Sequence, residues 1–255
     1  MASSDTLSLF VPDIGQTLTQ TVNGAEVVTG NLRDALRTQV FPNQEGRIRD
    51  VGIQAPESGD TTTRFLTRSE DTSLIGNADD NSVVFGAVAD NAFISTAGGN
   101  DSVNVNSFID GTIDLGDGDN VAVTGAITDS SITAGTGADQ VTIRRTATSV
   151  DVDLGAGDDT LIFGGRVLSS SIEMGEGADV LRFSSSARNT SIDLGNDFDI
   201  DKVYFETRSD IASGTVITGA GEGDELIIGG SEYIFSAADS AFISTTDPGD
   251  SITFG

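Results

Sequence analysis

Alternating apolar and polar residues recur along most of this chain at a nearly constant spacing. From about residue 74, each repeat begins at an aliphatic position, the anchor, which is followed by a stretch rich in Gly and Asp. Successive anchors are 19 or 20 residues apart, except for a final step of 24 residues. The anchors are Leu74, Ile94, Ile113, Ile132, Val152, Ile172, Ile192 and a last position at about Val216. A fixed period of this length is typical of repeat architectures.

A second alternating pair of apolar residues follows each Gly-rich stretch. The pairs are Val83/Phe85, Val103/Val105, Val121/Val123, Val141/Ile143, Leu161/Phe163, Leu181/Phe183 and Val203/Phe205. Short strands with a period of two, joined by glycine-rich corners, predict the coils of a parallel β-solenoid. We therefore predict an all-β fold, a parallel β-solenoid of about eight rungs with repeats of 19–20 residues.

The two ends of the chain differ from this repeat. We assign residues 1–70 to an N-terminal adaptor or capping segment, 71–230 to the solenoid and 231–255 to a C-terminal cap. Leu32, Leu36 and Val40 lie four residues apart, a spacing that predicts one short amphipathic helix within the first segment. The run Gly30 to Leu36 is also similar to the capping helix that opens many pectate lyase-like β-helices.

The composition of the chain excludes several kinds of catalytic and metal site. The chain of 255 residues has 40 acidic and 13 basic residues, a net charge of −27, and neither His nor Cys. Catalytic triads with His, thiol nucleophiles and disulfides are therefore excluded, and any metal must be bound through oxygen. A chain with this much negative charge repels phosphate backbones and anionic lipids. We therefore expect it to bind neither nucleic acid nor a membrane.

The corner stretches concentrate these acids. In a solenoid, successive corners stack, so carboxylates lie over carboxylates, an arrangement that is unfavourable unless a cation lies between them. Glycines let backbone carbonyls turn toward the same point, and carbonyl and carboxylate oxygens are the ligands that Ca²⁺ prefers. The alternative is that Gly and Asp simply form good turns. The predicted calcium ligands are Asp101, Asp119, Asp139, Asp159, Asp179, Asp199 and Asp224, with Gly116, Gly118, Gly135, Gly137, Gly155, Gly157, Gly175 and Gly177.

These corners resemble the RTX calcium-binding repeat, Gly-Gly-x-Gly-x-Asp-x-aliphatic-x. The stretches 135–141 and 155–161 match it from the second glycine onward. The first family glycine is replaced by Leu115, Ala134, Leu154, Met174 or Leu194, and each repeat holds one such corner where the usual RTX roll has two. The chain is therefore most similar to one-sided RTX-like solenoids of bacterial adhesins, and this resemblance implies one calcium row.

The residue after each anchor is predicted to point outward. This position reads Ser95, Asp114, Thr133, Asp153, Glu173 and Asp193. We interpret it as a solvated face; the alternative is a weak cation site. Thr and Asn do not repeat within the corners, which argues against ice binding.

For function, we expect a non-catalytic structural or attachment protein on a virion surface, as head decoration or tail fibre, or otherwise extracellular. The first residues lack a secretory signal, which fits release by lysis. The near-neutral residues 1–70 are expected to contact the protein surface of a larger assembly, and we expect a homo-oligomer. The alternatives are an RTX-type protein exported by a type I system and, third, a polysaccharide lyase or epimerase.

Overall fold

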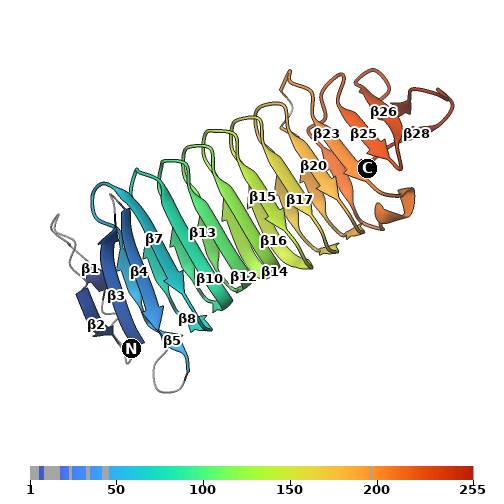
Figure 1. The fold of residues 1–255 in the computed structure, drawn as a ribbon. Coiled ribbons are helices and arrows are strands. Elements are labelled where there is room, and N and C mark those ends of the chain that lie inside the picture. Colours follow the sequence, from blue (N-terminus) through green and yellow to red (C-terminus); the bar gives the residue numbers. More distant parts are fainter. Residues whose placement is uncertain are drawn as a thin grey trace.

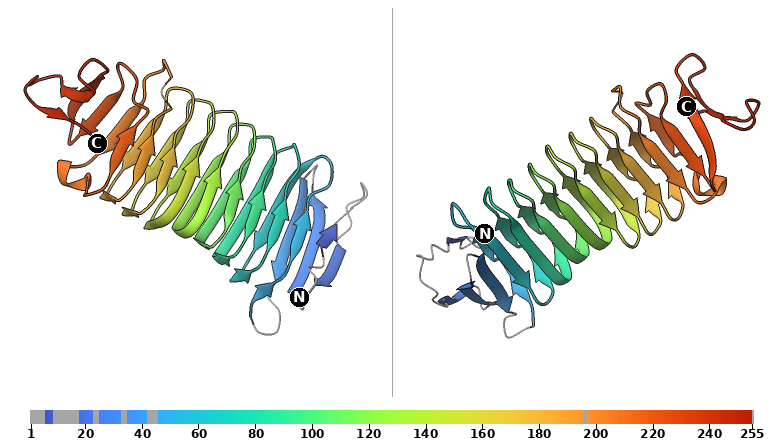
Figure 2. Two further views of the ribbon diagram at one scale, coloured as in Figure 1. Left: turned by 180° about the vertical axis from the view of Figure 1, so that it is seen from behind. Right: turned by 45° about the horizontal axis from the view of Figure 1, so that its top comes forward.

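The computed structural model describes residues 6–8, 18–22, 25–32, 35–41, 46–195 and 197–254, with side chains from residue 46 onward. It is a parallel β-solenoid of about nine coils, so the predicted fold class is confirmed (Figure 1). The coils stack into one elongated rod, and the two chain termini lie at opposite ends of it (Figure 2). Within these described residues no α-helix forms, and none is long and apolar enough to cross a membrane.

Each coil contains a short first strand, a three-residue middle strand, a glycine-rich corner and a long strand. Separate first strands are β5 (Ile48–Arg49), β8 (Ser69–Glu70), β18 (Val167–Leu168) and β21 (Ala187–Arg188). Separate middle strands are β6 (Gly52–Gln54), β9 (Ser73–Ile75), β11 (Phe93–Ser95), β13 (Thr112–Asp114), β19 (Ser171–Glu173), β22 (Ser191–Asp193) and β24 (Val216–Thr218). Separate long strands are β7 (Asp60–Phe65), β15 (Gln140–Ile143), β17 (Thr160–Phe163), β20 (Val180–Phe183), β23 (Lys202–Phe205) and β25 (Glu225–Ile228).

In the central coils, consecutive segments merge into continuous strands. β10 (Asn81–Asp90) and β12 (Ser102–Ile109) each join a long strand to the next first strand, β14 (Val121–Thr133) continues into a middle strand, and β16 (Ala147–Asp153) joins a first and a middle strand. A positive-φ residue separates the first strand from the middle strand in successive coils, for example Asp110 at φ 51° and Ser149 at φ 52°. Asp, Asn and Ser at this bend keep its side chain polar and exposed.

The predicted anchors form one column through the middle strands. Leu74 pairs with Ile94, and the column continues coil by coil to Ile192. Its last member is Ile217, one residue beyond the predicted position, because Ile192 pairs with Ile217. All eight are buried. Removing these aliphatic side chains from water stabilises the stack of coils.

A second buried column runs along the long strands and contains stacked phenylalanines. The rings of Phe163, Phe183 and Phe205 lie parallel, with centroids 5.3 and 4.6 Å apart. Phe65 and Phe85 stack in the same way at 4.2 Å. One exception corrects the sequence analysis: in β14, Ala122 and Thr124 are buried, whereas Val121 is 41% exposed. The inward pair is therefore one residue later than Val121/Val123.

The predicted helix from Leu32 to Val40 is wrong. This region contributes to two strands, β3 (Ala25–Leu32) and β4 (Ala35–Phe41), which pair as an antiparallel hairpin. β4 also pairs in parallel with β7, the first long strand, and β2 (Leu18–Val22) pairs with β3. The open end of a solenoid presents unpaired backbone N–H and C=O groups, which a strand can satisfy and a helix cannot. That requirement prevails over a weak helical spacing.

Parallel pairing also begins before residue 71. β5, β6 and β7 pair with the next coil, and β1 (Thr6–Ser8) pairs with β6. At the other end, β26 (Ser231–Ser236), β27 (Ala241–Ser244) and β28 (Ser251–Ile252) add antiparallel strands after β25. A 3₁₀ turn, η1 (Arg208–Asp210), precedes β24, and Arg208 forms a 3.0 Å ion pair with Asp250 of the cap. Both ends of the rod are thus covered by additional strands.

Candidate functional site

The candidate site is the edge of the rod formed by the glycine-rich corners. Each corner packs so closely on the previous one that glycine is needed. A Cβ on Gly157, which has φ 143°, would lie 1.9 Å from the carbonyl oxygen of Gly137, and one on Gly175 would lie 1.8 Å from that of Gly155. Neighbouring corners are joined by backbone hydrogen bonds, such as Ala156 N–H to Gly135 O at 2.9 Å. The glycines therefore have a packing role that does not require an ion.

The residue that ends each corner is buried, and these residues form one continuous line that we call the corner row. Its members are Asn81, Asp101, Asn120, Asp139, Asp159, Asp179, Asp201 and Asp224. At every step, the Oδ1 oxygen of one member accepts a hydrogen bond from the backbone N–H of the preceding member, at 2.7 to 3.1 Å. The side chains of the row thus satisfy buried N–H groups at the turns of the coils.

Five of the seven predicted acidic ligands lie in this row: Asp101, Asp139, Asp159, Asp179 and Asp224. Asp119 and Asp199 lie outside the row. Both side chains are exposed, and the row positions in their coils belong to Asn120 and Asp201. The predicted glycines all lie in the stacked corners beside the row. The sequence analysis also missed Asn81.

The two asparagines reveal what the second polar atom of a row side chain meets. Nδ2 of Asn120 donates to the carbonyl oxygens of Gly118 and Gly116, at 2.9 and 3.3 Å. Nδ2 of Asn81 likewise donates to a carbonyl of its own corner, Asn77 O, at 3.0 Å. A hydrogen-bond donor therefore occupies this position and is satisfied by the carbonyls of the same corner.

Aspartate has an acceptor at the equivalent position. Oδ2 is buried and has no hydrogen-bond partner in Asp101, Asp139, Asp159 and Asp179. Oδ1 of these aspartates accepts the same backbone hydrogen bond as Oδ1 of Asn120, so we infer that Oδ2 takes the place of Nδ2 and faces corner carbonyls, which are acceptors as well. Two acceptors facing each other are unfavourable unless a proton or a cation lies between them. Asp224 differs, since its Oδ2 accepts the N–H of Gly221 at 2.8 Å.

The pKa values of the row carboxyls are shifted in the direction that this arrangement implies. Burial raises the pKa of Asp101 to about 6, of Asp159 to about 7 and of Asp179 to about 8. Burial also raises the pKa of Asp201 to about 7. The backbone N–H bonded to each carboxyl opposes this shift, and neighbouring carboxylates add to it. Burial thus favours the neutral acid at these positions.

A second set of corner acids remains at the surface. Oδ1 of Asp117 accepts both the N–H and the hydroxyl of Thr136 in the next coil, each at 2.9 Å, and these bonds lower the pKa of Asp117. Asp119 and Asp158 each accept one backbone N–H from an adjacent corner, at 2.9 and 3.0 Å. Each of these exposed acids therefore already links one coil to its neighbour.

The corners meet the requirements of calcium only in part. The unpartnered Oδ2 atoms are the feature that fits a cation, because a positive charge would relieve their opposition to the carbonyls. The number of ligands does not fit as well. Calcium takes six to eight oxygens, and among the residues that the structure describes no three acidic side chains lie together as a metal site. Calcium binding therefore stays a prediction.

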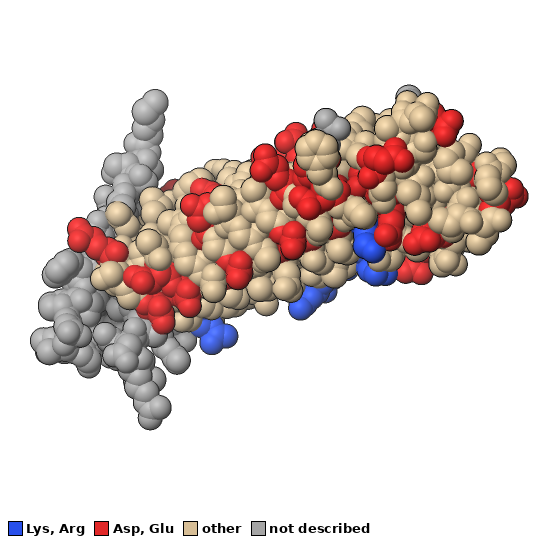
Figure 3. All heavy atoms as spheres, turned by 90° about the horizontal axis from the view of Figure 1, so that it is seen from above, with Lys and Arg blue, Asp and Glu red and all other residues tan. Residues whose placement is uncertain are grey.

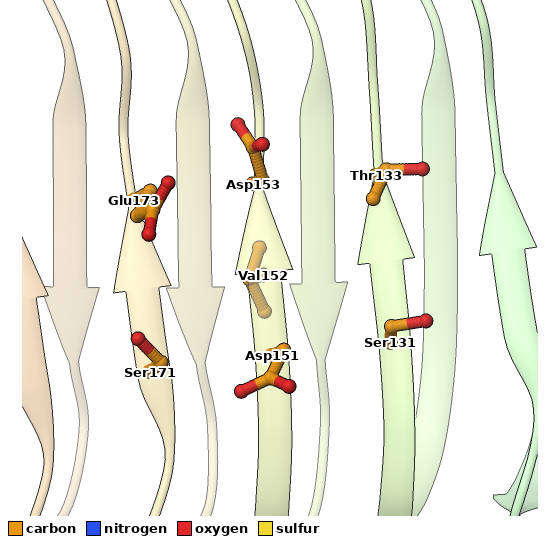
Figure 4. A pocket seen from close by; sticks show the side chains of 7 residues that line it. All are labelled: Ser131, Thr133, Asp151, Val152, Asp153, Ser171 and Glu173. Atoms are coloured by element: carbon orange, nitrogen blue, oxygen red, sulfur yellow. The ribbon is translucent and has the colours of Figure 1, made fainter.

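The outer face of the middle strands forms an open hollow lined by hydroxyls and carboxylates. Figure 4 shows Ser131, Thr133, Asp151, Asp153, Ser171 and Glu173 projecting from three neighbouring strands. Asp153 and Glu173 occupy adjacent positions in the pairing of β16 with β19. Both are exposed to water, in agreement with a solvated face.

Comparison of the chain with protein-family models, with curated proteins and with solved structures yields no match.

Proposed function

We propose that this protein is a non-catalytic structural or attachment module: an acidic rod displayed on a virion surface, as head decoration or tail fibre, or on a cell surface. The observation that supports this most directly is the unbroken register of the coils. The anchor column runs from Leu74 to Ile217 without a skipped coil, and its members are buried throughout. Such a rod provides length and rigidity with little variation in its surface.

The extra strands at both ends support the same proposal. β4 pairs with the first long strand and β26 with the last, so the long strands at both ends of the rod have partners on both sides. A rod with covered ends can be carried as a discrete part of a larger assembly. Attachment through residues 1–70 is part of this proposal.

We also propose that Ca²⁺ stabilises the corners, as the resemblance to RTX repeats implies. Asp101, Asp139, Asp159 and Asp179 would contribute Oδ2, and the glycine carbonyls of the same corners would contribute further oxygens. When bound, the ion would supply the positive charge that these opposed oxygens lack. The observation in support is the four buried, unpartnered carboxylate oxygens.

Thermal melting of the full chain tests the calcium proposal. An ion that binds only the native state adds ~2.7 kcal/mol when its free concentration is one hundred times Kd. We expect a higher Tm in millimolar CaCl₂ than in EGTA at pH 8, and no comparable rise with MgCl₂. A triple variant, Asp139→Asn, Asp159→Asn and Asp179→Asn, should lose the calcium response. Equal Tm values for the wild type in CaCl₂ and in EGTA would refute calcium binding.

Quantitative mass spectrometry tests the display proposal separately. Cell-free particles are purified from the source culture by density, and the chain is quantified relative to the major shell protein. A constant ratio through successive purification steps is expected for a virion component. Recovery only in the soluble medium, dependent on a type I transporter, would favour the exported RTX-type alternative.

A further inference from the structure

The outer face of the long strands differs in charge from the rest of the rod. We define the long-strand face by the two outward positions in each of seven successive coils: Ser82, Val84, Ser102, Asn104, Val121, Val123, Gln140, Thr142, Thr160, Ile162, Val180, Arg182, Lys202 and Tyr204. None of these residues is acidic, although 40 of the 255 residues in the chain are. In the next coil, β25 continues the same two positions with Glu225, which is the one acid of this face, and Ile227. The equivalent outward positions of the middle strands in the same coils include Asp114, Asp151, Asp153, Glu173 and Asp193.

Viewed from above the corner edge, the rod shows the same asymmetry. Acidic residues form repeated patches along the corner edge in Figure 3, and the Lys and Arg seen in this view lie along one side. The acids are therefore distributed unevenly around the rod, and the long-strand face has few of them.

The charges that the long-strand face does carry have partners within the chain. Lys202 Nζ lies 2.9 Å from an oxygen of Glu225 in the next coil. The guanidinium of Arg182 lies over the ring of Tyr204, with Cζ 4.1 Å from the ring centroid. Covering this face would therefore not leave either cation without a partner, so the cost of removing them from water is reduced.

One column of the long-strand face is largely uncharged. After Asn104, the column in register is Val123, Thr142, Ile162, Arg182, Tyr204 and Ile227, in which Arg182 carries the one charge. These side chains are only partly exposed, and together they form a flat surface because the strands are in regular register. Flat sheets of this kind pack face to face at a separation of ~10 Å.

We propose that the long-strand face is the contact between two copies of this chain. A partner with a basic surface would be attracted by acids, so it would not require them to be excluded from its binding face. Exclusion is required when the neighbour is itself strongly acidic, because opposed carboxylates repel each other. This chain carries a net charge of −27, so a second copy is a partner of that kind. The contact pairs the same face of both copies, as in a two-fold dimer.

The dimensions of the face predict a weak association. Strands of four residues and seven coils give a surface of ~13 by ~34 Å, smaller than the ~800 Å² per partner of a standard stable interface. We therefore expect a concentration-dependent dimer, with Kd in the micromolar range, that tightens as salt screens the net charge.

Sedimentation equilibrium of the full chain tests the proposal at ~1 to ~100 μM protein and at two ionic strengths, a range that brackets a micromolar Kd. The wild type should shift from monomer to dimer within this range. Thr142→Asp and Ile162→Asp each place a carboxylate in the contact and should weaken dimerisation by at least ~10-fold. Thr133→Asp and Ser171→Asp add the same charge to the outer face of the middle strands and should leave Kd unchanged.

Circular dichroism and melting confirm that each variant folds, and Thr142→Asp is the milder substitution should Ile162→Asp unfold the chain. A wild type that stays monomeric at the highest concentration would overturn the proposal. So would equal weakening by the two pairs of variants, since that result would report only a general effect of charge.

Discussion

Two sets of carboxylates recur in register along this rod, and their surroundings are opposite. In the corner row, Asp139 and Asp159 are 0% and 1% exposed and bind backbone N–H groups of the preceding coil. On the outer face of the middle strands, Asp153 and Glu173 are exposed to water. The same residue type at the same spacing thus organises the turns in one place and supplies surface charge in the other. Burial decides which role applies.

The largest expected difference between the two sets is their response to pH. The row carboxyls have raised pKa values in the folded chain, between about 6 and about 8 for Asp101, Asp159 and Asp179, against ~3.9 when unfolded. Their contribution to stability is therefore complete near pH 4 and is lost as pH rises through 6 to 8. Asp117, whose pKa is lowered, acts in the opposite sense and only at lower pH. Without divalent cations, we expect Tm to fall by at least ~10 °C from pH 5 to pH 9.

The second largest expected difference is the loss of unfolding free energy when a single acid of each set is replaced by alanine. Asp159→Ala removes the acceptor of the buried Asp139 N–H, bonded at 2.7 Å, and should cost ~2–3 kcal/mol. Asp153→Ala removes an exposed charge and should stay within ~0.5 kcal/mol. Urea unfolding at pH 6 measures both. Equal losses would mean that burial does not distinguish the two positions.

Asparagine in place of aspartate gives a smaller and more specific effect. Asp159→Asn keeps the Oδ1 acceptor and adds an amide that can donate to the corner carbonyls, as Asn120 does. We expect little change at pH 5 and a gain of ~1 kcal/mol at pH 8, where the wild-type carboxyl is ionised. Asp153→Asn is the matched control and should show no gain at pH 8. A loss of stability at both pH values would contradict a donor position at Asp159.

The smallest expected effect is a difference in stability cost between a glycine in a stacked corner and one in open space. Gly59→Ala, at φ 98° with open space around it, should cost only the backbone strain of ~1–2 kcal/mol. Gly157→Ala adds to a similar strain a contact 1.9 Å from Gly137 O, so it should cost at least ~1 kcal/mol more. Thermal melting of both variants gives the comparison. Equal losses of stability in the two variants would show that the corners can accommodate a Cβ atom at Gly157.

The sequence predicts the solenoid well because the anchors recur with little variation and one face of each strand must be buried. The sequence is a weaker guide to which residue of a coil belongs to the corner row, wherever the glycine spacing and the strand register disagree. Each row residue precedes the first inward residue of its long strand by two positions, as Asp159 precedes Leu161. In the coil of β14 the first inward residue is Ala122, and taking Val121 instead selects Asp119 in place of Asn120. Small residues such as alanine give no signal of burial by themselves.

The row position near Asp199 and the N-terminal hairpin are hard to predict for related reasons. The corner that ends at Asp201 follows Asp179 by 22 residues, two more than the preceding step, so alignment on its glycine selects the wrong aspartate. Leu32, Leu36 and Val40 fit a helical spacing, but the choice of strand depends on an open edge at β7 that is not visible in local sequence. In both cases the deciding information lies in the neighbouring coil.

The hydrogen bonds of the corner row all run the same way, and this gives the rod a polarity of assembly. The N–H of each row residue before Asp224 donates to a side chain of the coil that follows it in the chain, as Asp159 N–H does to Asp179 Oδ1 at 2.8 Å. During synthesis, the row N–H of every newly emerged coil therefore lacks its side-chain acceptor until the next coil arrives. Shortening the chain from its C-terminal end would leave the row N–H of the last remaining coil in the same state. Shortening it from the other end would instead leave a row side chain without its backbone donor.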